Sequence, residues 1–186
     1  MRIVGGKWRG QRLFQLSKSL IGIGLRPTTD RVRETMFNIL QHGIGFEMKE
    51  SRVLDLFCGT GALGLEALSR GANCVCFIDV EKTSLNIVNK NLNILGIENE
   101  VTLLQRDVTK LKQNHEQDYN LIFLDPPYGK GLGELALGNA LERGWISQNA
   151  TVVWEEKDEV FPPEELHLIK SRAIGISCLN FLKRCN

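Results

Sequence analysis

A chain of 186 residues can bury one substantial core but is too short for two ordinary domains. Its 42% hydrophobic and 24% charged residues are typical of a soluble globular protein, and no apolar run is long enough to span a bilayer. The five cysteines follow no disulfide framework and the three histidines are widely spaced. We therefore expect a cytoplasmic protein, without a signal peptide, a membrane segment or a metal site.

The net charge of +1 hides a strong asymmetry between two parts of the chain. Residues 1–33 hold eight lysines and arginines against the single acid Asp30, so this segment carries +7 and the remaining 153 residues carry −6. A basic arm on a slightly acidic body is typical of nucleic-acid-binding proteins. The alternative is a solvated, flexible tail, but Trp8, Phe14 and the Arg26-Pro27 step are unusual in disordered basic tails.

The first 45 residues predict a short hairpin followed by a helix. Residues 2–4 and 11–14 flank a Gly-rich connection, as hairpin strands do. After a loop with several glycines, Pro27-Thr28-Thr29-Asp30 predicts a helix start with a threonine as N-cap, and His42-Gly43 predicts the helix end. We expect this helix to present Arg31 and Arg33 on a polar face. Residues 1–45 would then form a nucleic-acid-binding extension of a domain that spans residues 46–186.

From residue 51 the sequence alternates between strand and helix. Strands are expected at 52–56, 74–78, 101–104, 121–124 and 150–154, and helices at 62–70, 81–95 and about 134–143. An antiparallel pair, 166–170 and 174–182, ends the chain. This alternation predicts an α/β fold with a doubly wound, mostly parallel, seven-stranded Rossmann-like sheet and an antiparallel C-terminal hairpin.

A Gly-rich turn, Gly59-Thr60-Gly61, joins the first of these strands to its helix, and Gly64 completes a Gly-x-Gly-x-x-Gly pattern. Asp79 follows at the end of the next strand, twenty residues after Gly59. The glycines allow close approach of the backbone to a ligand, and an acid at this position can bind ribose hydroxyls. The pattern also fits a dinucleotide, so a nicotinamide-dependent oxidoreductase is an alternative.

Three further acids favour S-adenosylmethionine over a dinucleotide. Asp55, four residues before Gly59, can hold the ammonium group of a methionine moiety. Asp107 follows the third strand and can accept a hydrogen bond from an adenine amino group, and Asp125 would lie beside the methyl donor. The expected cofactor-binding residues are Asp55, Phe57, Gly59, Thr60, Gly61, Asp79, Asp107 and Val108.

The tetrapeptide Asp125-Pro126-Pro127-Tyr128 follows a buried strand, at the sheet edge where such folds bind ligands. The prolines fix φ and remove two N–H donors. The Asp125 carboxylate and the Pro126 carbonyl can accept both N–H bonds of a planar amine, and Tyr128 can stack on its ring. Holding both hydrogens turns the delocalised lone pair of such an amine toward an electrophile. Asp125, Pro126 and Tyr128 are therefore candidate catalytic residues; the alternative is a Pro-rich turn that only closes a strand.

The chain resembles the bacterial RsmD family in three motifs: Asp55-Leu56-Phe57-Cys58-Gly59-Thr60-Gly61, Asp125-Pro126-Pro127-Tyr128 and Arg26-Pro27-Thr28-Thr29-Asp30-Arg31-Val32-Arg33-Glu34. The resemblance covers nearly the whole chain, and the Arg-Pro-Thr segment selects the family, because DNA and protein-glutamine methyltransferases share the Pro-Pro loop. It implies transfer of a methyl group from S-adenosylmethionine to N2 of a guanine in 16S ribosomal RNA, the guanine at position 966. The chain departs from the family at Ile174, where an aromatic residue is expected.

The resemblance also implies the partner, which is 16S ribosomal RNA within a small ribosomal subunit or an assembly intermediate, and a monomeric enzyme. The expected RNA-binding residues are Lys7, Arg9, Arg26, Thr28, Arg31 and Arg33. A DNA adenine-N6 methyltransferase shares the tetrapeptide, but it usually needs a target-recognition domain for which 186 residues leave little room. A non-catalytic RNA-binding module on the same fold is a further alternative.

Overall fold

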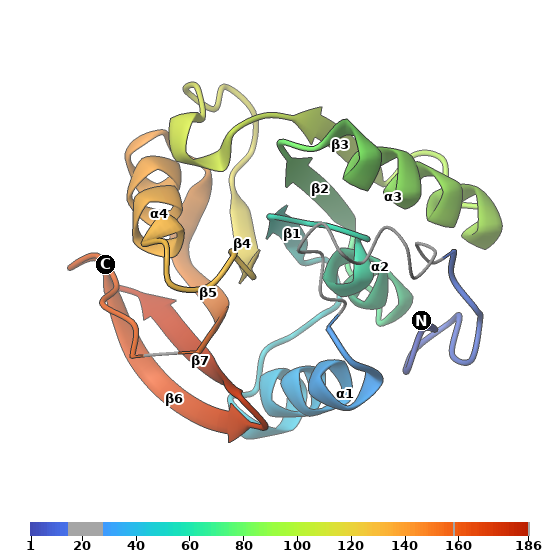
Figure 1. Cartoon of the computed structure of the whole chain (residues 1–186), viewed down its shortest axis with the longest axis horizontal. Coiled ribbons are helices and arrows are strands. Elements are labelled where there is room, and N and C mark those ends of the chain that lie inside the picture. The colour runs from blue at the N-terminus through green and yellow to red at the C-terminus, as the bar shows by residue number, and fades with distance from the viewer. Residues whose placement is uncertain (15–27, 158, 186) are drawn as a thin grey trace.

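A seven-stranded sheet in the order β3-β2-β1-β4-β5-β7-β6 runs through the computed structural model, which describes residues 1–14, 28–157 and 159–185 (Figure 1). Five strands pair in parallel: β1 (Arg52–Leu56), β2 (Cys74–Asp79), β3 (Val101–Gln105), β4 (Tyr119–Leu124) and β5 (Ile146–Glu156). The antiparallel hairpin of β6 (Leu166–Ile174) and β7 (Ser177–Arg184) joins the sheet through β7 and β5. The predicted α/β fold with a mostly parallel sheet is confirmed.

Helices cover both faces of the sheet and create two hydrophobic cores. On one face lie α1 (Asp30–Asn38) with its π-helical continuation Ile39–Gly43, α2 (Ala62–Ser69) and α3 (Lys82–Leu95). On the other lie α4 (Leu132–Glu142) and the 3₁₀ turn Val108–Lys110. Because both faces are covered, the central strands are apolar throughout: Phe123 belongs to the first core and Leu124 to the second. In the described part of the chain, no helix is long and apolar enough to cross a membrane.

Two elements differ from the sequence prediction. β5 begins at Ile146 and not at residue 150, because the strand continues through a bulge at Asn149, which has φ 60°. The pairing of β5 with β4 shifts register at this bulge. The C-terminal turn is expected at residues 171–173 but lies at residues 175–176, because β6 continues to Ile174 and Gly175 takes the turn with φ 64°.

The N-terminal hairpin is present and is fixed to the end of α2. Its strands meet at the Arg2–Arg12 bridge. The N–H groups of Lys7 and Trp8 donate to the backbone carbonyl and the Oγ of Ser69, at 2.6 and 3.0 Å. These bonds occupy acceptors at the C-terminal turn of α2, where carbonyls have no partner within the helix. A side chain at Gly6 would collide with the same carbonyl, so this basic loop has one way of docking on the helix.

Arg33 is buried, so the prediction that it lies on a polar face is wrong. Its side chain is 1% exposed and donates to the backbone oxygens of Thr28 and Arg2, both at 2.6 Å, and to Asp30 Oδ1 at 2.7 Å. Only a guanidinium has enough donors in a fixed plane to serve three acceptors at once. The residue therefore joins the start of α1 to the N-terminal hairpin. The predicted cap is confirmed, since Thr29 Oγ1 accepts from Val32 N.

Arg33→Ala should lower the free energy of unfolding by about 2–4 kcal/mol, because two backbone carbonyls and a carboxylate lose a charged donor in a buried place. The matched control is Arg31→Ala, two residues away on the same helix but exposed, which should change stability by less than about 0.5 kcal/mol. Urea denaturation measures both. Equal losses in the two variants would contradict the proposed role of Arg33.

Candidate functional site

The Gly-rich turn after β1 is held in a left-handed conformation at three positions. Phe57, Gly59 and Gly61 have φ of 58°, 52° and 76°. For Phe57 this conformation costs on the order of 1–3 kcal/mol, and such strain gathers at ligand sites. The last glycine of the pattern has another role, because a Cβ on Gly64 would lie 2.4 Å from the ring of Phe77. The first two glycines shape the turn, and Gly64 brings α2 close to β2.

Asp79, at the end of β2, fixes this turn from the neighbouring strand. Its Oδ2 accepts from Gly59 N at 2.9 Å, and its Oδ1 accepts from Glu81 N at 2.8 Å. A carboxylate oxygen has two lone-pair positions, so each oxygen can accept a further hydrogen bond. Asp79 thus stands where the Gly-rich turn and the start of α3 meet, with capacity left for hydroxyl groups of a ligand.

Asp55 is a buried acid at the end of β1. It is 2% exposed, and its Oδ2 accepts from Gly64 N, in the first turn of α2, at 3.0 Å. Burial raises the pKa of Asp55 well above its usual range, and the negative charges of Asp125 and Asp79 raise it further, against the opposing effect of the Gly64 hydrogen bond. A positively charged ligand beside Asp55 would relieve both effects.

Asp107 follows β3 and caps the 3₁₀ turn. Its Oδ1 accepts from the Oγ1 and N of Thr109 at 2.7 and 3.0 Å, and Lys110 Nζ lies 3.4 Å from its Oδ2. The Thr109 hydrogen bonds lower the pKa of Asp107, with a smaller contribution from Lys110. Asp107 is exposed, whereas Val108 is buried in the second core. The acid is therefore ionised and oriented at the edge of the sheet, and Val108 can offer a ligand little beyond its backbone.

The Pro-rich loop after β4 meets the N-terminal segment. Thr28 Oγ1 donates to Asp125 Oδ2 at 3.1 Å, and the Thr28 carbonyl is one of the acceptors of Arg33. Pro126 is buried and Pro127 is exposed, so the loop turns outward after its first proline. The sequence pattern places Thr28 among RNA-binding residues and does not reveal its bond to Asp125. No pattern of spacing links two residues 97 positions apart.

Tyr128 is tied to the C-terminal part of the sheet. Its hydroxyl donates to Glu155 Oε1 at 3.1 Å, and the same oxygen accepts from Ser177 Oγ at 2.9 Å. Burial raises the pKa of Tyr128, and the charges of Glu155 and Asp125 raise it further. The hydroxyl is therefore a donor and cannot serve as a base. Sequence reasoning misses Glu155 and Ser177, because each follows an apolar strand pattern without a motif of its own.

Asn91 connects the N-terminal hairpin to the Gly-rich turn. This fully buried side chain accepts from Phe14 N at 2.6 Å through Oδ1 and donates from Nδ2 to the Thr60 carbonyl at 3.3 Å. It comes from the middle of α3, so one amide holds three segments together. The hairpin and the expected cofactor turn thus share a structural support.

The predicted RNA-binding residues divide into three groups. Lys7 and Arg9 are exposed on the loop that docks on α2, and Arg31 is exposed on α1. Arg33 is buried and donates three hydrogen bonds to protein acceptors, so its guanidinium is not at the surface where a phosphate could reach it. Arg26 lies outside the described residues. Lys7 Nζ also lies 4.8 Å from the ring centroid of Trp8, which orients its ammonium group beside an aromatic surface.

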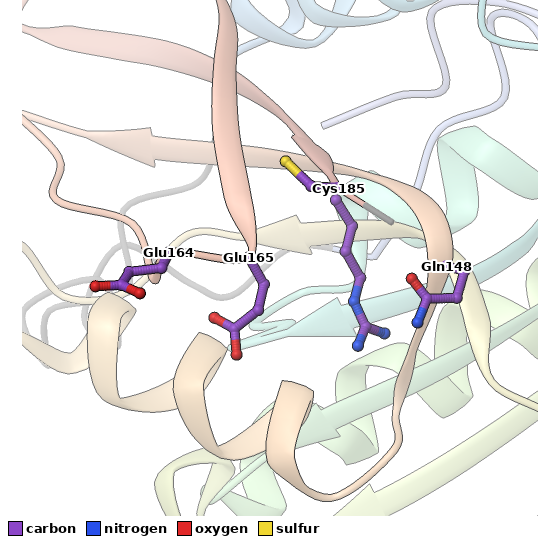
Figure 2. A pocket seen from close by; sticks show the side chains of 5 residues that line it. Gln148, Glu164, Glu165 and Cys185 are labelled. Carbon is purple, nitrogen blue, oxygen red and sulfur yellow. The ribbon is translucent and has the colours of Figure 1, made fainter.

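A separate pocket lies near the start of β5 and the end of β7 and is lined by Gln148, Glu164, Glu165, Arg184 and Cys185 (Figure 2). Arg184 also donates to the Ile146 carbonyl at the first residue of β5. The predicted site residues lie at the opposite, carboxyl edge of the parallel strands. The pocket therefore takes no part in the site built by the Gly-rich turn and the Pro-rich loop.

Comparison with known proteins gives a consistent result. A family described as "Conserved hypothetical protein 95" matches residues 1–183. The chain is 40% identical over 181 residues to ribosomal RNA small subunit methyltransferase D of Haemophilus influenzae, which covers 95% of this chain and 90% of that protein. The Escherichia coli protein of the same name is 38% identical over 159 residues, covering 86% of this chain and 76% of that protein.

Solved structures agree over the full length. A putative methyltransferase from Escherichia coli matches with a TM-score of 0.83 at 32% identity, covering 100% of this chain and 98% of that chain. A putative methylase from Haemophilus influenzae matches with a TM-score of 0.79 at 33% identity and the same coverage. The chain therefore belongs to the RsmD family, the family of ribosomal RNA small subunit methyltransferase D, as its three motifs predicted.

Proposed function

We propose that this chain transfers a methyl group from S-adenosylmethionine to the exocyclic N2 of a guanine in 16S ribosomal RNA. The observation that carries the proposal is the meeting of two loops at one sheet edge. The Gly-rich turn with Asp55 and Asp79 lies beside the loop of Asp125, and the charges of these acids interact. The names of the relatives, which state a small-subunit ribosomal RNA methyltransferase, support the substrate class.

The residues of the first loop suit S-adenosylmethionine. Asp55, buried and short of a positive partner, would hold the ammonium group of the methionine moiety. Asp79 would bind the ribose hydroxyls through its remaining lone pairs, and Asp107 would accept from the adenine amino group. Phe57, Gly59, Thr60 and Gly61 would line the cofactor with backbone, and Val108 would contribute its backbone at the adenine end. When bound, the cofactor supplies an electrophilic methyl group.

The second loop would hold the amine that receives the methyl group. Asp125 and the Pro126 carbonyl accept the two N2 hydrogens, which aims the nitrogen lone pair at the methyl carbon. N2 would take the methyl group from the bound cofactor, which leaves as a neutral thioether, and the proton released from N2 would pass to the Asp125 carboxylate. Asp125 need not be a strong base, because the amine becomes acidic once it is methylated. Orientation is therefore the main contribution of this loop, and Tyr128 stacks on the base.

The basic extension would supply the RNA affinity. A guanine in structured RNA has to leave its stack, at a cost of a few kcal/mol that interactions with the protein must offset. Lys7, Arg9 and Arg31, with Arg26, would bind phosphates, while Arg33 instead holds the extension together. In this division residues 1–45 bind RNA and residues 46–186 carry the methyl transfer. We further propose that the protein acts as a monomer in the cytoplasm, on a small subunit or its assembly intermediate.

The orienting role of Asp125 can be tested by substitution. Asp125→Ala should lower turnover by about two orders of magnitude or more, the size expected when an orienting hydrogen bond at the reacting atoms is removed. Its affinity for S-adenosylmethionine should change much less. Asp125→Asn keeps an acceptor oxygen and should retain part of the activity. Transfer of labelled methyl to 16S RNA, with DNA as the comparison, measures both variants; a wild-type rate in a folded Asp125→Ala protein would refute the catalytic role.

Cofactor binding should depend on pH through Asp55. Its raised pKa means that Asp55 takes up a proton at a higher pH than an ordinary aspartate does, whereas the cofactor ammonium group requires the carboxylate. Affinity should therefore fall as the pH falls through this raised pKa, and binding should release protons. Calorimetry in buffers of different ionisation enthalpy detects that release. Asp55→Asn should abolish it, and a wild-type affinity that is constant with pH would contradict the assignment.

The basic extension is tested by salt dependence. Replacing Lys7, Arg9 and Arg31 together with Ala should weaken RNA binding and reduce the slope of log K against log salt by about one for each phosphate that is no longer neutralised. Affinity for S-adenosylmethionine should not change. The control removes the same charge elsewhere, at Lys49, Lys112 and Arg143 near the starts of parallel strands. If the slope falls equally in both triple variants, the extension has no special role.

A further inference from the structure

Asp125, directly after β4, and Glu155, near the end of β5, lie at the same level and on the same face of the sheet. β4 and β5 pair in parallel up to Leu124 and Trp154, so the next residue of each strand is one of these acids. Side chains alternate along a strand, which puts Asp125 and Glu155 on the face of Phe123 and Val153. The hydrogen bond from Tyr128 to Glu155 confirms that this carboxyl group lies beside the Pro-rich loop.

One oxygen of Glu155 is fully used and the other is not. Oε1 accepts from Tyr128 and from Ser177, whereas Oε2 has no hydrogen-bond partner within the described residues. The residue is only 6% exposed. An unpartnered carboxylate oxygen in a buried place is costly, and such groups in native proteins call for a functional explanation. At this position, the explanation with the right chemistry is a hydrogen-bond donor on the substrate.

Guanine has such a donor next to the amine that is methylated. Its N1–H lies beside the N2 amino group on the same edge of the base, so an acceptor for N1–H has to lie beside the acceptors for N2. We propose that Glu155 Oε2 accepts the N1–H of the target guanine and so selects guanine among bases. This inference rests on the proposed function. In adenine, N1 is an acceptor, and it would face the lone pairs of Glu155.

The route to this oxygen passes Tyr128. Oε2 is shielded from solvent in the protein alone, so the base has to displace the side chains around it. Tyr128 is bonded to the same carboxyl group and is the ring that stacks on the base in the proposed function. When the Tyr128 ring turns onto the base, its hydroxyl no longer donates to Glu155. The N1–H of the base then becomes the new donor to this carboxylate. The number of hydrogen bonds to this buried carboxylate is thereby maintained.

The test compares an RNA fragment that carries guanosine at the target position with one that carries 2-aminopurine there. Both bases have the exocyclic amine, but N1 of 2-aminopurine is a bare acceptor. For the wild type, kcat/KM should be at least about tenfold lower on 2-aminopurine, because the buried acceptor is left without its donor. In Glu155→Gln the preference for guanosine should shrink by about tenfold or more, because an amide can donate to that N1.

Two control variants separate recognition from support of Tyr128. Ser177→Ala and Tyr128→Phe each remove a donor to Oε1 and leave Oε2 in place, so they should lower turnover on both bases and keep the preference. An unchanged preference in Glu155→Gln, or equal wild-type rates on the two bases, would overturn the inference. If Glu155→Gln does not fold, Glu155→Asp, which withdraws the carboxylate by one methylene, is read by the same criteria. A wild type inactive even on guanosine would instead refute the proposed function.

Discussion

The site depends on the parallel pairing of β1 with β4. This pairing joins two halves of the sheet that run outward in opposite directions, toward β3 on one side and toward β5 on the other. The chain therefore leaves β1 and β4 toward different faces and opens a space between the two connections. The Gly-rich turn occupies one side of that space and the Pro-rich loop the other. Residues from distant parts of the sequence can face a common ligand only because of this arrangement.

The same arrangement concentrates negative charge, and hydrogen bonds from neutral groups make it tolerable. Asp55 and Asp79 accept backbone N–H groups of the Gly-rich turn and α2, whereas Asp125 and Glu155 accept hydroxyl groups of Thr28 and Tyr128. In these bonds to Asp55, Asp79 and Glu155, the donors are N–H and O–H groups without a positive charge. The site is thus set up to receive a cationic cofactor and a base whose reacting edge consists of donors, and its electrostatics match the proposed reaction before any ligand arrives.

The sequence predicted the parts of the structure that have local causes. Apolar runs indicated the buried strands, Thr29 indicated the helix cap, and glycines before a helix indicated the turn between β1 and α2. Arg33 was misplaced, because its burial depends on two backbone carbonyls that only the folded chain brings to it. Glu155 and the Thr28–Asp125 bond were missed for a related reason: β-strand alternation shows which face a side chain takes but not which loop lies over it. The bulge at Asn149 was hidden because polar residues before Ala150 suggested a loop.

The docking of the N-terminal hairpin has a consequence for the order of folding. Its partners Glu66, Ser69 and Asn91 lie 61 to 77 residues further along the chain. During synthesis the hairpin emerges before these partners, and it has nothing to dock on until α2 and α3 have formed on the sheet. Its basic loop therefore acquires a fixed shape only after the cofactor turn has been built. A chain interrupted before that stage presents the positive charge of its hairpin in no defined geometry.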